Sequence, residues 1–335
     1  MRRLLFAALI FVALGPMPGT VMRFPKVDLT ESAAARPIAF APAQKGAVRF
    51  VRGWHLVSPH SRFGGFSALA RTGANGFQLV GDNGYWTRLT LDSRGAVSDV
   101  RIRPLPTPDG RPPRKSMADA EAMFVDPVSG KSWIALEGIN QIWRLGADLA
   151  AIEARRKLPR WPGNLGPESM VRLTDGRTIV LSEDADDDPR GREGLLYTGD
   201  PAEPGPGPIR FFYASDGRGM VSDAAPLPDG RILLVHRRLG FDPVFTTILS
   251  VADPADIKAD AVVRSRTIGR VPTPLAENYE GAAVSIEGGR TFLWLVADNN
   301  FNVWQRSLLL QFELVDLPPK RTPAKKSGDS KKAAP

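Results

Sequence analysis

The chain lacks cysteine altogether and has only three histidines among its 335 residues. Without cysteine it has no disulfide framework, thiolate metal site, cysteine nucleophile or cysteine-linked lipid anchor. The histidines, His55, His60 and His236, show none of the spacings typical of zinc ligands. A Walker A loop and a dinucleotide-binding glycine fingerprint are also missing. The remaining candidates for chemistry are carboxylates, basic side chains and hydroxyl groups, and His60 stays open as a base beside its interpretation as a surface histidine.

Long hydrophobic runs are scarce as well, and the clearest one lies at the N-terminus. Arg2 and Arg3 precede the apolar run Leu4–Leu14, and glycine and proline residues follow it. A bilayer span needs roughly 20 apolar residues, so this run is short for a transmembrane helix. The pattern predicts a secretory signal over residues 1–19 and export to the periplasm or the extracellular space. A clear A-x-A cleavage site is missing, so an uncleaved N-terminal anchor with weak membrane association stays open.

The net charge of +8 comes from the two ends of the chain. The segment 319–335 has six Lys or Arg residues against one Asp, whereas residues 40–318 carry no net charge. A nucleic-acid-binding domain carries its basic residues within the folded part, so we expect no nucleic-acid partner. Residues 317–335 are almost free of apolar side chains, which predicts a disordered basic tail. We expect residues 20–44 to be a linker and the protein to be a monomer.

A repeat of about fifty residues runs through the middle of the chain. The similar segments are FGGFSALA (63–70), MADAEAMFVD (117–126), LGPESMVRLTDG (165–176), MVSDAAPLPDG (220–230) and NYEGAAVSIEGG (278–289). We align them on Phe66, Glu121, Glu168, Asp223 and Glu280, which gives intervals of 55, 47, 55 and 57 residues. Four of the five segments therefore carry an acid at the aligned position.

Short runs rich in β-branched and aromatic residues follow each segment, and Asp-Gly or Gly-Gly turns separate them. Four strands per unit at this period predict an all-β fold, a β-propeller over residues 45–316. Five blades are countable, and six stay open if the stretch 186–210 contains a degenerate blade. A pair of β-sandwiches is the alternative, but it does not explain the spacing. We expect Val48–Val57 to pair with the last unit, because an open ring would leave two exposed edges.

Several motifs together resemble one family. They are SRFGGFSAL (61–69), DNGYW (82–86), KSMADAEAM (115–123), PES (167–169), LPDGRILLVHRR (227–238), NYEGAAV (278–284) and VADNNFNVWQRSLLLQFEL (296–314). With these motifs the chain resembles the phytase-like family of bacterial exported proteins, which carries the label "esterase-like activity of phytase". That label rests on similarity to calcium-dependent propeller phytases. The resemblance implies hydrolysis of a small-molecule phosphoester or ester.

The acids of the repeat are the candidate functional residues. We expect them just before the first strand of each blade, so that the repeat gathers them at one mouth of the central channel. Carboxylates without cysteine suit a hard cation such as Ca²⁺, and the candidate ligands are Asp119, Glu121, Glu168, Asp223 and Glu280. The candidate catalytic residues are Glu121, Glu168 and Glu280. Arg62, Lys115 and Arg237 are the candidate substrate-binding residues, able to hold a phosphate beside the cation.

A second set of residues stands at the ends of the following strands. It comprises Asp82, Glu137, Glu183, Arg237 and Asp298. We expect these side chains at a different level of the channel, because one strand runs between the two sets. The aligned position of the first unit is Phe66, so the ring of acids is incomplete. Acids at equivalent positions also cap turns, and the alternative function is therefore a non-catalytic periplasmic ligand-binding or scaffold propeller.

Overall fold

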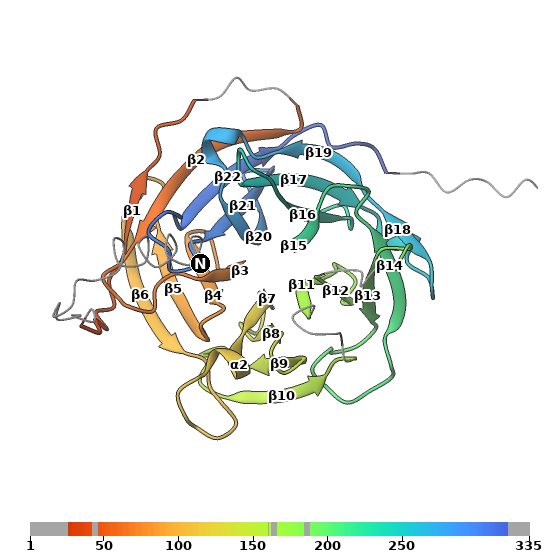
Figure 1. Cartoon of the computed structure of the whole chain (residues 1–335), viewed down its shortest axis with the longest axis horizontal. Helices are drawn as coiled ribbons and strands as arrows, with labels where there is room; N and C mark the ends of the chain where they lie inside the picture. Colours follow the sequence, from red (N-terminus) through yellow and green to blue (C-terminus); the bar gives the residue numbers. More distant parts are fainter. Residues whose placement is uncertain (1–25, 42–45, 160, 162–165, 184–187, 321–335) are drawn as a thin grey trace, which may run out of the picture.

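The computed structural model describes residues 26–41, 46–159, 161, 166–183 and 188–320. Within them, five sheets stand around a central axis as the blades of a β-propeller (Figure 1). The predicted fold is confirmed, with five blades. The predicted signal and residues 321–335 of the predicted tail lie outside the described residues. No helix in the described part of the chain is long and apolar enough to cross a membrane.

The first two blades have four strands each, with the first strand of each blade innermost. Blade 1 contains β3 (Phe66–Arg71), β4 (Gly76–Gly81), β5 (Tyr85–Leu91) and β6 (Val97–Pro104). Blade 2 contains β7 (Ala120–Val125), β8 (Ser132–Leu136), β9 (Gln141–Leu145) and β10 (Ile152–Lys157). A single helical turn, α2 (Lys115–Ala118), leads into β7. Each blade therefore uses one continuous stretch of sequence, as the repeat predicts.

Blade 3 includes one short strand, β18 (Val262–Arg264), from the sequence segment that otherwise forms blade 4. Blade 3 contains β11 (Pro167–Arg172), β12 (Thr178–Ser182), β13 (Arg192–Tyr197), β14 (Ile209–Ala214) and β18, which runs parallel to β14. Blade 4 contains β15 (Met220–Pro226), β16 (Ile232–Leu239), β17 (Phe245–Ala252) and β19 (Arg266–Arg270). Two 3₁₀ turns, η1 (Pro254–Asp256) and η2 (Thr273–Leu275), flank β18 and β19. The stretch considered for a sixth blade supplies the outer strands of blade 3.

The fifth blade joins the two ends of the propeller. It contains β20 (Asn278–Glu287), β21 (Arg290–Asp298), β22 (Leu308–Leu314), β2 (Val48–Val57) and β1 (Ala34–Pro37). β2 pairs antiparallel with β22, with Trp54 opposite Leu309, so the predicted closing strand is confirmed. β1 pairs with β2 and adds the outermost strand. This strand lies inside the range predicted as a linker, so the propeller begins earlier than predicted.

The core lies between neighbouring blades, where the faces of adjacent sheets pack. Between blades 5 and 1, the rings of Trp54 and Trp294 stack with centroids 6.3 Å apart, and Phe77 meets Trp294 edge-on at 4.9 Å. β2 approaches β22 closely at Gly53, where a Cβ atom would lie 2.5 Å from Leu310 Cδ2. Such packing holds the innermost strands in fixed positions around the axis.

Each innermost strand has one irregularity near its start. The pairing with the second strand skips one residue there, and the skipped residues are Ser67, Glu121, Glu168, Ser222 and Glu280. A β-bulge of this kind redirects a side chain and occurs frequently beside functional sites. The bulges define the structural equivalence of the blades. The alignment on Phe66 and Asp223 is therefore wrong by one residue in blades 1 and 4, and serine occupies the equivalent position in both.

Candidate functional site

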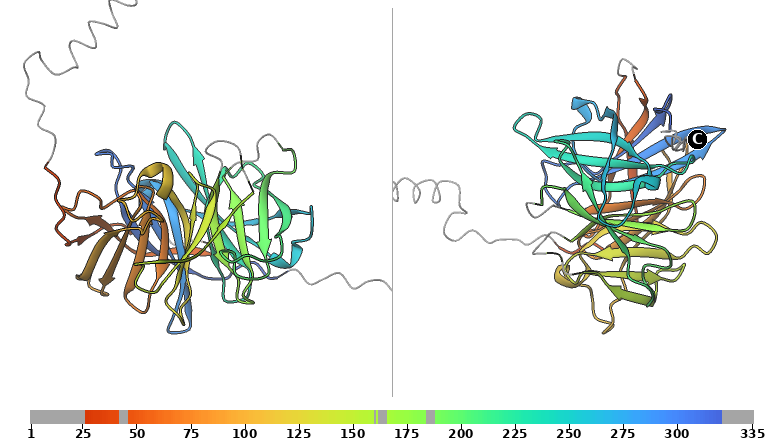
Figure 2. Two further views of the ribbon diagram at one scale, coloured as in Figure 1. Left: turned by 90° about the horizontal axis from the view of Figure 1, so that it is seen from below. Right: turned by 90° about the vertical axis from the view of Figure 1, so that its right-hand side faces the viewer.

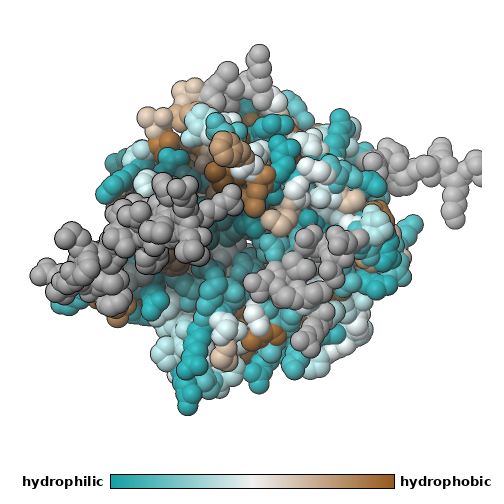
Figure 3. Space-filling view, viewed as in Figure 1, coloured by the Kyte–Doolittle hydropathy of each residue, from teal (hydrophilic) through white to brown (hydrophobic). Residues whose placement is uncertain are grey.

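Acidic side chains converge at the end of the channel where the innermost strands begin. This end faces the viewer in Figures 1 and 3, and the space-filling view is hollowed near the centre of the ring. The bulge residues Glu121, Glu168 and Glu280 lie within β7, β11 and β20 rather than just before them, contrary to the prediction. We call this end the acidic mouth, defined by Asp82, Asp119, Glu121, Glu137, Glu168, Glu183, Glu280 and Asp298.

A second ring lies at the same mouth, formed by the residues at the ends of the second strands. In blades 1 to 3 the backbone N–H group of each of these residues donates to the backbone carbonyl oxygen of the residue two places before the bulge. The pairs are Asp82 to Gly65 (2.9 Å), Glu137 to Asp119 (2.8 Å) and Glu183 to Gly166 (3.0 Å). In blades 4 and 5, Arg237 is opposite Met220 and Asp298 is opposite Asn278. The prediction that this ring lies at another level is wrong, because an antiparallel hairpin brings both ends to one edge.

Two glycines make room for this second ring. A Cβ atom on Gly65 would collide with the carboxylate of Asp82, and one on Gly166 would collide with the side chain of Glu137. Gly65 also has a positive φ of 61°, which glycine adopts without steric cost. In blade 2 the equivalent residue is Asp119, which adds a carboxylate of its own. The acids are therefore most crowded around blade 2.

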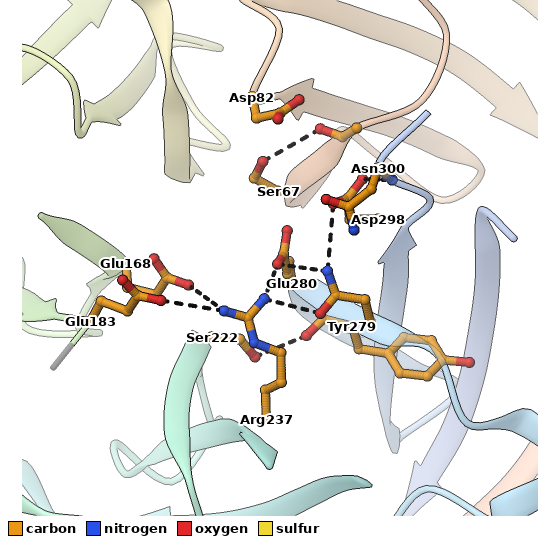
Figure 4. A network of polar contacts seen from close by, with 12 residues as sticks. Ser67, Asp82, Glu168, Glu183, Ser222, Arg237, Tyr279, Glu280, Asp298 and Asn300 are labelled. Carbon is orange, nitrogen blue, oxygen red and sulfur yellow. Dashed lines mark hydrogen bonds and ion pairs between the residues drawn. The ribbon is translucent and has the colours of Figure 1, made fainter. Parts of the chain in front are cut away.

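Arg237 stands where all four other blades carry a second-ring acid at the end of their second strand. Its guanidinium lies 3.6 Å from Glu168 and 3.4 Å from Glu183, and it forms a still shorter ion pair with Glu280 (Figure 4). It also donates to Asn278 Oδ1 at 3.0 Å. Only 14% of its side chain is exposed. Burial alone would lower the pKa of Arg237, but these carboxylates raise it, so the arginine is a permanent cation inside the mouth.

The acids remain in excess of the cations that contact them. Burial, together with repulsion between the carboxylates, raises the pKa of both Glu121 and Glu168 well above its usual range. Burial also raises the pKa of Glu280, and burial with the nearby Glu280 raises the pKa of Asp298 to about 8. Crowded carboxylates gain stability from protons or from a bound cation. The mouth thus favours the uptake of protons or of a cation.

Three of these acids have the geometry of a metal site. Asp119, Glu121 and Glu137 each offer a carboxylate oxygen, and the three oxygens lie within 4.8 Å of one another. The Oδ1 atom of Asp119 is buried without a hydrogen-bond partner among the described residues. Lys115 lies 2.5 Å from Asp82 and 3.7 Å from Asp119. Oxygen donors of this kind fit a hard cation. The predicted ligands Asp119 and Glu121 therefore lie together, and Glu137 joins them.

Two of the predicted site residues lie elsewhere. Asp223 is buried away from the bulge ring, and its carboxylate accepts hydrogen bonds from the backbone N–H groups of Ala224 (2.8 Å) and Ala282 (2.6 Å). It thereby ties blade 4 to blade 5. Arg62 is exposed, and its guanidinium lies 5.6 Å from the ring centre of Tyr85. Among the described residues, the ion pairs of the acidic mouth include neither Asp223 nor Arg62.

The other end of the channel differs in chemistry. A cavity of about 430 Å³ lies there, between the later residues of all five innermost strands. Its walls include Leu69, Met123, Met170, Ala224 and Ala282. The two ends of one channel therefore offer an acidic and a mainly apolar environment.

Comparison of the sequence with known families gives one match. Residues 61–301, well over half of the chain, match the family described as "Phytase-like: Esterase-like activity of phytase". The matched range runs from the loop before β3 to the loop after β21, and it includes every residue of the acidic mouth. A search of the curated proteins finds no match.

Several solved structures resemble the chain at low identity. Hydrazine synthase from Kuenenia stuttgartiensis is 13% identical with a TM-score of 0.41; the match covers 72% of this chain and 58% of that one. Glutaminyl cyclase from Myxococcus xanthus is 12% identical with a TM-score of 0.48, covering 80% of this chain and 97% of that one. The Cps50 (Swd1) β-propeller domain from Myceliophteria thermophila is 10% identical with a TM-score of 0.38, covering 78% and 77%. Similarities this distant say nothing about chemistry.

Proposed function

The chain belongs to the phytase-like family, and on that premise we propose that it is a hydrolase acting on small phosphoesters or carboxylic esters at the acidic mouth, assisted by Ca²⁺. One observation carries the proposal: eight carboxylates from four blades converge beside two cationic side chains, Lys115 and Arg237. Acids that only cap turns would each be satisfied locally by backbone amides, as Asp223 is. Several acids of the mouth instead repel one another.

The residues divide into a cation site and a substrate site. Asp119, Glu121 and Glu137 would hold the cation through carboxylate oxygens. A bound Ca²⁺ would polarise the phosphoryl or carbonyl group of the substrate. Lys115 has a side chain that is 65% exposed at the rim, so its ammonium group can bind an anionic oxygen of the substrate. Substrate and cation would therefore meet beside blade 2.

Glu168 and Glu280 are the proposed proton acceptors. Water attacks the phosphorus or acyl carbon and gives one proton to a carboxylate. The bond to the leaving oxygen breaks, and this oxygen takes up the same proton from the carboxyl group and leaves as the alcohol. A carboxylate with a raised pKa is a stronger base than an ordinary one, and the pKa of both Glu168 and Glu280 is raised. Arg237 lies between the two glutamates and fixes their orientation. We therefore assign Arg237 a positioning role.

The test is hydrolysis by the full chain with added Ca²⁺ and again after chelation. Phytate and an aryl phosphate report phosphate release, and an aryl acetate reports ester cleavage. We expect calcium-dependent turnover that Glu121→Gln abolishes. The matched control is Glu287→Gln, because Glu287 lies on the same strand as Glu280 but at the other end of the channel. This control should retain full activity.

Absence of turnover with all three substrates would contradict the hydrolase. Calorimetry would then decide what remains. Calcium binding that is lost in Glu121→Gln but kept in Glu287→Gln would leave a non-catalytic binding or scaffold propeller. No calcium binding at all would remove the metal site as well.

We also propose that the protein is exported, on the pattern of residues 1–19. Mass spectrometry of the protein isolated from its host would show whether the N-terminal segment is removed. Cytoplasmic protein with an intact N-terminus would contradict export.

A further inference from the structure

Three segments around the acidic mouth expose large apolar side chains. The loop between β16 and β17 carries Phe241, which is 99% exposed. The loop between β21 and β22 carries Val303 and Trp304, which are 91% and 86% exposed. Val27 and Leu29, near the first described residue, are exposed as well. Side chains of this size at such exposure mark an interaction surface when they gather on one face.

All three segments belong to the face of the acidic mouth. β16 passes Arg237 at the mouth and ends two residues later, before the loop with Phe241. β21 ends at Asp298, whose side chain accepts from Asn278 in the acidic network. The third segment is fixed by Asp28, whose carbonyl oxygen accepts from the N–H of Ser61 at 2.8 Å, just before blade 1.

The figures agree with this placement. In the left view of Figure 2, the β16–β17 hairpin rises on the same side of the ring as α2 and the described N-terminal segment. Figure 3 shows this face, with brown apolar side chains beside the central hollow among hydrophilic neighbours. The loops that carry Phe241, Val303 and Trp304 therefore leave the ends of β16 and β21 on this side of the ring.

We infer that this face of the propeller docks on a lipid bilayer and inserts Phe241, Val303 and Trp304 between the lipids. The three side chains stand on the tips of two separate loops that extend from neighbouring blades. A protein partner needs a contiguous, complementary patch, whereas a bilayer accepts isolated apolar side chains. Tryptophan in particular prefers the membrane interface, because its ring is apolar and its N–H is polar.

The preceding sequence supports a bilayer as the occupant. The described chain begins at Lys26 on this face, and the sequence before it contains two arginines followed by the apolar run Leu4–Leu14. A chain that keeps this run would be tethered to the bilayer through a segment that joins the described part at this face. The β16–β17 loop carries one charged residue, Asp242, and Arg238 precedes this loop near the end of β16. Docking on a bilayer without net charge therefore depends on apolar insertion and should be insensitive to salt.

This inference does not depend on hydrolysis. Flotation of the full chain with phosphatidylcholine vesicles measures the partition coefficient. We expect the triple variant Phe241→Ser/Val303→Ser/Trp304→Ser to partition at least about tenfold more weakly, since burying each such side chain is worth about tenfold or more. The matched control is Val128→Ser/Ile286→Ser, because both side chains are exposed at the other end of the ring. The control should partition like the unchanged protein, at low and at high salt.

Fluorescence separates loop insertion from binding by the N-terminal segment alone. Lipids brominated on their acyl chains should quench Trp304, so Trp304→Phe should show less quenching than the unchanged protein. Equal quenching, or equal partition of the triple variant, would overturn the inference. Sedimentation tests the other occupant: a dimer that the triple variant abolishes would assign the surface to a second copy of the chain and would also overturn it.

Discussion

Replacing Arg237 with methionine tests whether the arginine neutralises the acidic mouth. Methionine keeps much of the length of the side chain and removes the charge. Arg237 contacts Glu168, Glu183 and Glu280, and only 14% of its side chain is exposed. Removing one partner of a buried ion pair costs about 3–5 kcal/mol, because the remaining charge is left uncompensated. We therefore expect Arg237→Met to lower the free energy of unfolding by about that amount without calcium.

Thermal unfolding is the assay. For a domain of this size, 1 kcal/mol corresponds to about 2–4 °C, so the expected decrease in Tm is roughly 10 °C. The control is Arg238→Met, because Arg238 is the next residue of β16 and its side chain is exposed. The double variant Arg237→Met/Glu280→Gln should recover part of the loss, since it removes one of the uncompensated carboxylates.

Calcium provides a second readout of the same variant. Without the guanidinium, the glutamates are freer to interact with a cation, so calcium should raise the Tm of Arg237→Met more than that of the unchanged protein. A ligand at 100 times its Kd stabilises the folded state by about 2.7 kcal/mol. A Tm of Arg237→Met that equals that of Arg238→Met would refute the assignment of Arg237 as the internal counter-ion.

Three further predictions follow from individual residues. The pKa of Asp298 is about 8 in the folded protein and has its ordinary value of 3.8 in the unfolded chain. Between these two values the folded state binds more protons than the unfolded state, so the Tm without calcium should fall as pH rises from 5 to 8.5. A flat profile would contradict the raised pKa. Asp223→Asn should lower the free energy of unfolding by about 1–3 kcal/mol, because the amide replaces one carboxylate oxygen that accepts from Ala282 or Ala224. Calorimetry should find its calcium affinity within about twofold of the unchanged protein, and a larger loss would place Asp223 in the site. In Gly53→Val the new side chain should collide with Leu310, which should lower the free energy of unfolding in urea by about 1–3 kcal/mol. An unchanged urea midpoint would mean that β2 does not need to approach β22 this closely.

The sequence predicts the propeller because its repeat is visible without the structure. Turn dipeptides and β-branched runs recur at one period. The strand-like run Val48–Val57, which closes the ring, is left over because it belongs to none of the repeat units. The acids Glu121, Glu168 and Glu280 are found for the same reason, since they recur at equivalent positions. The first two strands of each blade thus follow from local pattern alone. β1 escaped prediction because four residues of strand carry too little pattern.

The errors come from register, which the sequence does not display. In blade 4, Asp223 aligns with Glu168 in sequence, but the bulge makes Ser222 the structural equivalent and directs the side chain of Asp223 into the core. In blade 1 the same one-residue shift makes Ser67, and not Phe66, the equivalent residue. The prediction for the level of the second ring is also wrong, because an antiparallel hairpin brings the end of the second strand beside the start of the first. The pairing of Arg237 with three glutamates depends on the closed ring and has no local signal.

The closing strand also sets the order in which the protein can be completed. β2 and its partner β22 lie about 250 residues apart in the sequence, so the ring stays open until nearly the whole chain is present. In a growing chain, β2 and β1 would lack their partner β22 for most of the synthesis. The entropy of closing a loop grows only with the logarithm of its length, so the delay costs time more than stability. Blade 5 is therefore the last of the five blades that a growing chain can complete.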